Sequence, residues 1–468
     1  MEKNGLKRKL AFASADIFGG GSFNIINFLY PGFLAITVGI DPFLIGVIVL
    51  VARVWDAFTD PLMGHISDRT NSKMGKRRIY LVISAPLVLI SMYFLFFPYA
   101  FSSVTLRVIA VLTSYLVFTT VQTSVMIPYY SLSSEISSDY QKRASYNSYR
   151  LGFSIFSSII CVAVPGIMVT MFGDEAIGYQ VMSITFGLLF GLSVLITGLF
   201  AREEIKTPKV ETKLSVKELV KPLGLRPFRQ YLGMFLVLQM SMAIMSGLFF
   251  FYVDFHIVKS VTFNQETSFV GMIAAALMFS MQIVALPIYL KMIAKKGKTF
   301  AYRFGAYMWI VTAIFIIFIP ADVNPIVLYI LAALMGFGIS GPGLVPHTMY
   351  GDVVDAGQIK FEDRLDGQMS GFTNFINKIA QGLGLALVMF LIGLAGFKEK
   401  ELGGPDVFSQ PDEAMLMIRW IMTLTPLIFM GIGIFISFKY KITADKQKEI
   451  ADAIKNENLS REEILNSL

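Results

Sequence analysis

The sequence has few charged residues and only one cysteine. Asp, Glu, Lys and Arg make up 16% of its 468 residues, against about a quarter in soluble globular proteins. Cys161 cannot form an internal disulfide, and we expect it to be a small apolar packing residue. The chain also has no metal-binding His/Cys cluster, no phosphate-binding glycine loop and no nucleophile–base set. These absences argue against a soluble protein and against an enzyme.

The sequence consists largely of long apolar runs. The chain is 55% hydrophobic, and its mean hydropathy is +0.63. Its length accommodates about twelve membrane spans of roughly 20 to 25 residues each. Apolar runs predict spans at residues 12–37, 42–67, 78–98, 104–134, 146–172, 178–201, 229–258, 266–292, 301–319, 324–350, 368–396 and 412–439. The prediction is an all-α polytopic membrane protein.

Basic residues occur in alternate loops, and this pattern predicts the topology. They gather before span 1, between spans 2 and 3, after span 4, between spans 6 and 7, between spans 8 and 9, and in the tail. The loops near 38–42, 99–103, 173–178 and 320–324 carry none, and Lys259, Lys398 and Lys400 are the exceptions in the other predicted outer loops. The positive-inside rule then places both termini in the cytoplasm, in a plasma (inner) membrane. The net charge of +7 is therefore read as topology, and we expect no nucleic-acid partner. No cleavable signal peptide is apparent, so the first apolar run is expected to stay as a span.

A polar interruption divides the predicted spans into two groups of six. We expect an N-terminal bundle at 1–201, a central cytoplasmic loop at 202–228, a C-terminal bundle at 229–440 and a cytoplasmic tail at 441–468. Such a layout suggests a binding site between the bundles, near the middle of the membrane. No strong sequence repeat relates the halves, and the tail reads as a solvated or surface-lying helix.

Two carboxylates, Asp56 and Asp60, lie one helical turn apart near the middle of the second span. They share one face, about 6 Å apart at Cβ, and repel each other by about 3 kcal/mol at an effective dielectric constant of about 20. Such a pair holds a proton, captures a small cation or pairs with a nearby positive side chain. Thr59 adds a hydroxyl, and oxygen ligands suit a hard cation such as sodium. The alternative is structural ion pairing, for instance between Asp56 and Arg53.

Charged residues at the cytoplasmic helix ends are candidates for gating. Such networks can lock one state of a transporter and break on reopening, although solvated loop charges would look the same. The candidates are Asp68, Arg69 and Arg77 after span 2, and Asp352 and Asp355 after span 10.

The order of residues around these acids carries a family resemblance. Residues 64–78 have the pattern Gly-x3-Asp-Arg-x5-Gly-Lys-Arg-Arg, which resembles the signature of the loop between helices 2 and 3 in the major facilitator superfamily. Residues 51–64, Val-Ala-Arg-Val-Trp-Asp-Ala-Phe-Thr-Asp-Pro-Leu-Met-Gly, are closely similar to the second helix of its glycoside–pentoside–hexuronide:cation symporters, such as melibiose permease. Further matches are Ile-Pro-Tyr-Tyr-Ser-Leu at 127–132, Tyr149-Arg150, Asp352-Val-Val-Asp355 and Lys378. The resemblance covers residues 10–439 and implies twelve helices in two six-helix bundles.

The resemblance also implies a cation site. Asp56 and Asp60 match the family's cation-binding carboxylates. Thr59 stands where melibiose permease has asparagine, and Thr123 matches its span 4 threonine. Because both positions keep a side-chain oxygen, the coupling ion is expected to be Na⁺ or H⁺. Lys378 aligns with the family's lysine near the cation site, and an ammonium at that depth needs an acidic partner.

The substrate side matches less closely. Arg150 aligns with an arginine of the sugar site, and Tyr130 stands at a tryptophan position. The two aspartates that hold galactoside hydroxyls are replaced by Gly21 and Met126, while Asp16 lies nearby in sequence. This argues against a galactoside. Arg150 could pair with a substrate carboxylate, as in a hexuronide, and the alternative is pairing with Asp16 across helices.

Other polar residues in the spans are weaker candidates for lining a cavity, the alternative being hydrogen bonds between helices. Gln122 and Asn374 are those we take as candidate substrate contacts.

These features predict a monomeric, cation-coupled symporter in the lipid bilayer that has no cofactor and imports a sugar, glycoside or uronide-type solute by alternating access. Two alternatives stay open. One is transport of a lysolipid-like amphipathic solute, for which certain eukaryotic relatives are known. The other is a non-transporting membrane sensor built on the same helices.

Overall fold

The computed structural model describes residues 3–136, 140–201, 220–257, 265–320, 323–363, 365–399 and 410–455. These residues form helices and connecting segments, with no strand among them. Within these described residues, eleven helices are long and apolar enough to cross a membrane. They are α3 (Pro42–Arg69), α4 (Arg78–Leu95), α5 (Val104–Glu135), α6 (Tyr140–Thr170), α7 (Glu175–Phe200), α9 (Arg226–Phe251), α10 (Gln265–Lys296), α11 (Lys298–Phe318), α12 (Pro325–Phe361), α13 (Asp366–Leu394) and α14 (Asp412–Lys439). The predicted all-α membrane architecture is confirmed.

The first predicted span is helical but divided. Helix α1 (Lys3–Ala13) precedes α2 (Asp16–Gly32), which continues into a π-helix, η1 (Phe33–Thr37). Residues 16–37 together extend for about 30 Å, enough to cross the hydrocarbon core. The prediction of a single run over residues 12–37 missed the break between α1 and α2.

The seventh span ends in the same way as the first. Helix α9 continues into a second π-helix, η3 (Tyr252–Ile257). Short π-helices inside or at the end of α-helices occur frequently at functional sites. The first membrane-spanning segment of each half therefore ends in a π-helix, although the halves show no strong sequence repeat.

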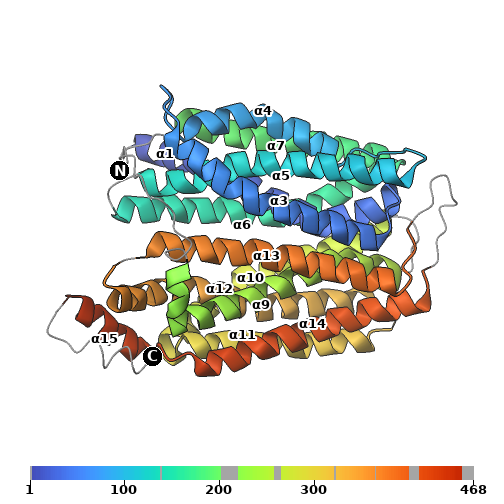
Figure 1. Cartoon of the computed structure of the whole chain (residues 1–468). Helices are drawn as coiled ribbons and strands as arrows, with labels where there is room; N and C mark the ends of the chain where they lie inside the picture. Colours follow the sequence, from blue (N-terminus) through green and yellow to red (C-terminus); the bar gives the residue numbers. More distant parts are fainter. Residues whose placement is uncertain are drawn as a thin grey trace. The chain divides into compact units, whose positions relative to one another are not determined.

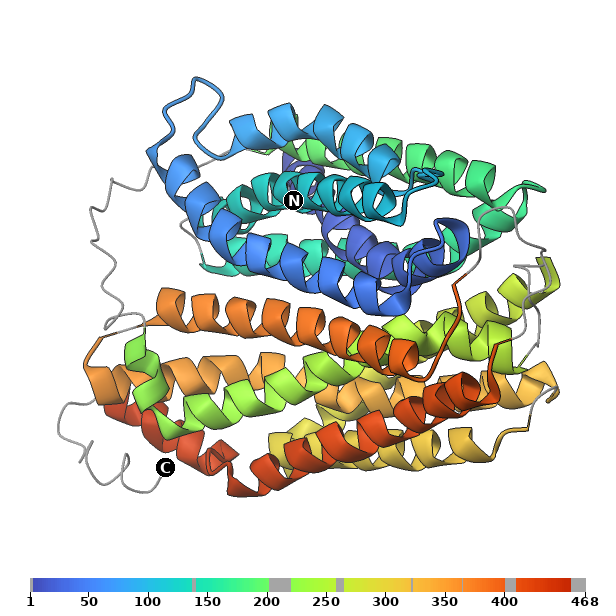
Figure 2. The ribbon, with the colours of Figure 1, turned by 45° about the vertical axis from the view of Figure 1, so that its right-hand side comes forward.

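Contacts group the chain into two compact units. The first contains Met1–Glu211, Phe249–Ala276 and Met389–Ala414, and the second contains Thr212–Leu248, Leu277–Val388 and Met415–Leu468. In the first unit, α4 packs against α5 and α7, α3 packs against α5, and α2 packs against α6 (Figure 1; Figure 2). The pairing of α2, α3, α5 and α6 brings together the helices that carry the candidate site.

In the second unit, α11 packs against α12, and α12 packs against the tail helix α15 (Ala444–Lys455). Ile450 and Ala453 of α15 are fully buried. The tail helix is thus docked on α12 through its apolar face, while most of its polar side chains stay exposed; the expectation was a solvated or surface-lying helix. The reason is amphipathicity: its apolar side chains recur at helical spacing and find a partner surface.

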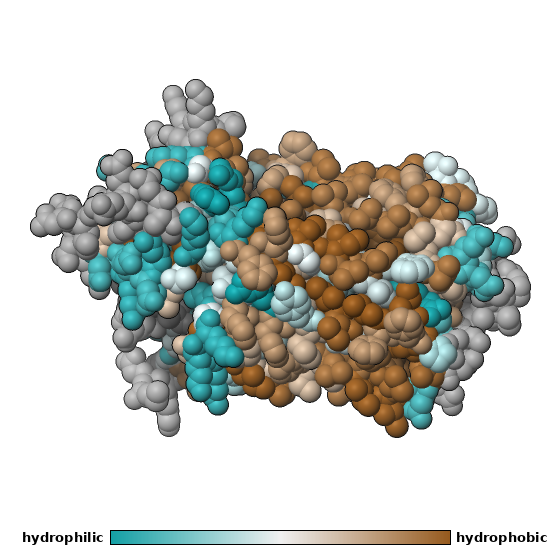
Figure 3. All heavy atoms as spheres, turned by 90° about the horizontal axis from the view of Figure 1, so that it is seen from below, coloured by the Kyte–Doolittle hydropathy of each residue, from teal (hydrophilic) through white to brown (hydrophobic). Residues whose placement is uncertain are grey.

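The second unit carries an apolar belt of the kind that faces lipid. Figure 3 shows a face of the molecule on which apolar side chains form a broad band, with hydrophilic side chains gathered toward the ends. Exposed apolar side chains of α11 and α14 include Val311, Phe315, Phe318, Ile428, Phe435 and Phe438. Apolar side chains are stable on the outside only where the surroundings are apolar too, so this belt fits a bilayer.

An arginine holds the end of η1 in place. Arg107, at the start of α5, donates hydrogen bonds of 2.7 Å to the carbonyl oxygens of both Val38 and Gly39. Arg107 is only 8% exposed, and Gly39 has a positive φ of 68°. Carbonyls at a helix end lack partners within the helix, so the guanidinium satisfies groups that would otherwise be left without one.

Replacing Arg107 with glutamine should therefore destabilise the first unit. We expect Arg107→Gln to lower the apparent melting temperature of the detergent-solubilised protein, by the equivalent of about 2 kcal/mol, because a charged donor to two carbonyls is lost. Thr105→Ala, an exposed position on the same turn, is the control and should melt like the unmodified protein. Equal melting of both variants would contradict this role.

Candidate cation and solute site

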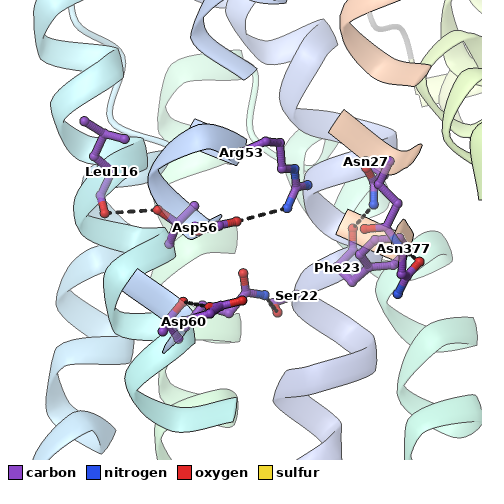
Figure 4. Close-up of polar contacts among 12 residues, drawn as sticks. Ser22, Phe23, Asn27, Arg53, Asp56, Asp60, Leu116 and Asn377 are labelled. Atoms are coloured by element: carbon purple, nitrogen blue, oxygen red, sulfur yellow. Dashed lines mark hydrogen bonds and ion pairs between the residues drawn. The ribbon is translucent and has the colours of Figure 1, made fainter. Parts of the chain in front are cut away.

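Asp56 and Asp60 lie on α3 in the first unit, as their spacing predicted, with Asp60 one turn further along. Asp56 is 3% exposed, and its Oδ2 lies 3.3 Å from Nη1 of Arg53, one turn earlier on the same helix (Figure 4). This is the pairing that the sequence left open as the alternative for Asp56. Asp60 is only half-buried. The two carboxylates therefore have different surroundings.

Hydroxyl oxygens from α3 and α5 lie near Asp60. The Thr123 hydroxyl donates a 2.8 Å hydrogen bond to Oδ1 of Asp60, and Thr123 is 5% exposed. The Thr59 hydroxyl is buried and has no hydrogen-bond partner within the described part of the chain. Carboxylate and hydroxyl oxygens on two packed helices are ligands that a hard monovalent cation can use.

Three ionisable side chains of α3 lie within about two helical turns. Arg53 carries a positive charge, and Asp56 and Asp60 each carry a negative charge when ionised. In apolar surroundings, a bound Na⁺ or H⁺ would lower the cost of placing two carboxylates so close together. The arrangement therefore offers oxygen ligands and negative charge to one small cation.

A tryptophan ties α3 to α5 beside the cluster. Nε1 of Trp55 donates a 2.8 Å hydrogen bond to the Thr120 hydroxyl, which donates in turn to the carbonyl oxygen of Leu116 at 2.7 Å. The sequence did not single out Trp55 or Thr120 for this role. The available signal was a tryptophan directly preceding a membrane aspartate. This bond helps to keep the register in which Asp60 meets Thr123.

A second polar cluster joins α2, α5 and α6. Nε of Arg150 lies 3.0 Å from Oδ2 of Asp16, and the Tyr129 hydroxyl donates to the same oxygen at 3.4 Å. The Arg150 guanidinium also lies 5.4 Å from the ring centre of Tyr130. The pairing of Arg150 with Asp16, left open by the sequence, is therefore present. Asp16 is 7% exposed in its side chain and Arg150 28%, so the pair is not sealed from its surroundings.

Arg150 keeps binding capacity beyond this ion pair. The bond to Asp16 uses Nε, and a guanidinium carries four more N–H donors on its two terminal nitrogens. Those donors suit a planar or tetrahedral anion, while the tyrosine faces suit an apolar or sugar ring. The cluster can therefore hold an anionic group of a solute.

Helix packing fills the position at which a galactoside-binding aspartate would stand. A Cβ atom at Gly21 would lie 2.4 Å from the Ser157 hydroxyl oxygen, 2.7 Å from Cys161 Sγ and 2.9 Å from a Phe190 ring carbon. Gly21 is therefore required for the close approach of α2 to α6 and α7. Met126 similarly packs against α2, where its Cε would lie 2.6 Å from a Cβ at Gly19. Both positions serve packing in this chain.

The remaining candidate solute contacts are distributed over both units. In the first unit, Nε2 of Gln122 donates to the Ser22 hydroxyl at 3.2 Å and joins α5 to α2. In the second unit, Asn374 and Lys378 lie four residues apart on α13, so they share a face of that helix. Gln122 thus makes a hydrogen bond between helices, which was the alternative for such residues.

The predicted gating residues form contacts within their own units. In the first unit, Arg77 pairs with Asp68 and donates to the Ser67 hydroxyl at 2.6 Å. Arg69 is exposed on the last turn of α3. These contacts tie the end of α3 to the segment before α4.

In the second unit, Lys298 Nζ lies 2.5 Å from Oδ2 of Asp352 and donates to the Thr348 carbonyl at 2.8 Å. Asp355 accepts a 3.4 Å hydrogen bond from Gln447 of the tail helix. The sequence had not singled out Lys298 or Gln447 as the partners of these two acids, because both partners are distant in sequence.

Comparison with known proteins points to one family. Residues 11–444 match the MFS/sugar transport protein family. The chain is 24% identical over 491 residues to the sodium-dependent lysophosphatidylcholine symporter 1 of Xenopus tropicalis, covering 96% of this chain and 90% of that protein. It is 25% identical over 452 residues to the putative glycoside/cation symporter YagG of Escherichia coli, covering 95% and 94%.

A solved structure supports the fold. The crystal structure of a bacterial homolog of the human lysosomal transporter Spinster, in an inward-facing and unoccupied conformation, superposes with a TM-score of 0.66 at 12% identity. The match covers 94% of this chain and 98% of that one. At this identity the likeness concerns the fold alone.

The tight packing at Gly21 can be tested with a matched pair of substitutions. Gly21→Ala should lower the apparent melting temperature, because overpacking costs about 1–3 kcal/mol. Gly152→Ala, on α6, places its Cβ in open space and should leave the melting temperature unchanged or raise it, since alanine favours helix by about 1 kcal/mol. A Gly21→Ala protein as stable as Gly152→Ala would refute the packing role.

Proposed function

This chain belongs to the MFS/sugar transport protein family and is an integral-membrane transporter, and we propose that it is a cation-coupled symporter. The observation that carries the proposal is the convergence of Asp56, Asp60 and the Thr123 hydroxyl on neighbouring helices of one unit. Relatives named as sodium-dependent and glycoside/cation symporters support coupling to a cation. We place the protein in the plasma membrane with both termini in the cytoplasm, on the strength of its basic loops.

Coupling follows from the repulsion between the two acids. Asp56 and Asp60 lie one turn apart on α3, and their mutual repulsion when both are ionised disfavours the compact arrangement of α3 against α5. Binding of Na⁺ or H⁺ lowers this repulsion and favours the conformation that binds solute. By linkage, the solute then raises the affinity for the cation by the same factor. Inward opening releases both.

The solute is proposed to carry an anionic group that Arg150 binds. Support comes from the free donor capacity of the guanidinium and from the flanking ring of Tyr130. A uronide-type sugar or glycoside fits, with its carboxylate on Arg150 and its ring against the tyrosine. Asp16 supplies the carboxylate that would accept sugar hydroxyls in place of the galactoside acids.

A lysophospholipid is the second candidate. Its phosphate would occupy the same arginine, and the packing of Met126 against α2 makes the neighbourhood less polar than a sugar site requires. The similarity to the lysophosphatidylcholine symporter of Xenopus tropicalis supports this alternative.

A non-transporting membrane sensor is the remaining alternative. Uptake of a solute into proteoliposomes, driven by a cation gradient, would exclude a purely sensory role.

Removing the ionisable group at residue 60 should uncouple transport. We expect Asp60→Asn to reduce sodium- or proton-gradient-driven uptake into proteoliposomes by roughly tenfold or more, because losing a charged ligand costs at least about 1.4 kcal/mol. Thr123→Val should weaken the apparent cation affinity while retaining some uptake. Asp445→Asn, an exposed acid of the tail helix, is the control and should transport normally. Full gradient-driven uptake by Asp60→Asn would exclude the proposed cation site.

Changes at residue 150 should separate solute binding from cation binding. Arg150→Lys keeps the charge but loses the planar fork, so thermal shifts induced by uronides or lysophospholipids should fall while those induced by sodium persist. The double variant Asp16→Asn with Arg150→Gln avoids a buried unpaired acid and should give the same result. Equal loss of both responses, in protein that folds normally, would make Arg150 a structural residue.

A further inference from the structure

Aromatic side chains close one end of the first unit. The Phe28 ring of α2 lies 6.0 Å from the rings of both Phe249 and Phe250, at the end of α9. Phe397, beyond α13, lies 5.3 Å from Phe251 and 5.4 Å from Phe255. The positive-inside rule places this end outside, because the loops near 38–42 and 173–178 that border it carry no basic residue, with Lys259 and Lys398 as the exceptions in its other loops. We refer to these six phenylalanines as the outer closure.

A small cavity lies within the outer closure and contains one polar side chain. It is lined by Phe28, Leu29, Gly32, Ile36, Phe250, Phe251, Asp254 and Phe255. Asp254, on the π-helix η3, is 5% exposed, and its Oδ1 is buried without a hydrogen-bond partner. A carboxylate in such a place costs several kcal/mol, whereas a neutral carboxyl costs far less.

Among the described residues, Asp254 makes no ion pair with a basic side chain. From α7, Glu175 and Tyr179 lie near enough to interact with it electrostatically, and Glu175 adds a second acid. On η3 itself, the His256 ring lies 5.4 Å from that of Tyr252. The walls from α2 and η1 are apolar. Because Asp254 is the only oxygen-bearing side chain in the lining, the cavity does not suit a metal cation, which needs several oxygen ligands.

We propose that Asp254 is a proton-binding site of the outer closure, so that acid outside the cell holds the path to the outside closed. This rests on the proposed function, because alternating access requires the closure to separate when solute enters from outside. The carboxyl holds a proton while the aromatic contacts are made. It releases that proton to the outside water when they separate.

The sign of the pH effect follows from this exchange. The closed arrangement binds one more proton than the open one, so low pH favours closure and high pH favours opening. Since the proton enters and leaves on the same side, it regulates access and is not among the transported ions. The coupling cluster around Asp60 is a separate site on α3 and α5.

The test measures access to the cavity in intact cells, without solute and without a cation gradient. Gly32→Cys serves as the reporter, because a side chain there meets nothing within 4 Å. It is introduced together with Cys161→Ala, which removes the natural thiol. A membrane-impermeant maleimide labels it at external pH values from about 5.5 to about 8.5. Labelling rates are divided by those of Ser102→Cys, an exposed position in the loop after α4, which removes the intrinsic pH dependence of thiol reactivity.

With Asp254 present, the normalised rate should rise by roughly fivefold or more over this range, since one linked proton can shift an equilibrium by up to about tenfold per pH unit. Asp254→Asn, and Asp254→Ser as a second variant, should give a low rate that does not vary with pH. Glu175→Gln should keep the rise.

A flat profile with Asp254 present, an unchanged rise in Asp254→Asn, or loss of the rise in Glu175→Gln would each overturn the proposal. Loss of uptake in Asp60→Asn bears on the cation site alone. Failure of the pH response and failure of the symport mechanism are therefore recorded by different experiments.

Discussion

The energetic penalty for burying charge among apolar side chains governs the polar architecture of the first unit. Each acid of the candidate site is met by a specific group: Asp56 by Arg53, Asp16 by Arg150, and Asp60 by the Thr123 hydroxyl. Two of these pairs join different helices, so satisfying the acids also determines how α2, α3, α5 and α6 pack. Two acids one turn apart on α3 repel each other, and this repulsion favours the binding of a mobile cation there.

Hydropathy predicted the membrane helices well, because crossing a bilayer demands a run of apolar residues of known length. It placed their ends less well where a helix continues past the bilayer. Helix α12 was expected to end near residue 350, but it continues to Phe361. Backbone hydrogen bonding does not stop where the apolar run ends, and the ion pair between Asp352 and Lys298 stabilises the added turns. The π-helices were not predictable, because a shift in hydrogen-bond register leaves no mark in composition.

The acids of the site were evident from the sequence, whereas their partners were not. A carboxylate in a membrane helix stands out by itself, but pairing between Arg150 and Asp16 depends on the rotation of two helices 134 positions apart in the chain. The same reasoning that singled out Asp56 could have found Asp254, which is the only Asp, Glu, Lys or Arg between Arg229 and Lys259. Alignment suggested that Gly21 marked a lost ligand, and only the packing around it showed a different role.

The contact around Gly21 has a consequence for how this lineage can change its solute. The Ser157 hydroxyl, the Cys161 thiol and the Phe190 ring occupy the space that any larger residue at position 21 would need. An aspartate could be accommodated there only after changes at these positions on α6 and α7. Mutational routes toward galactoside recognition are therefore epistatic. Across related sequences, the side-chain volumes at positions 21, 157 and 161 should covary.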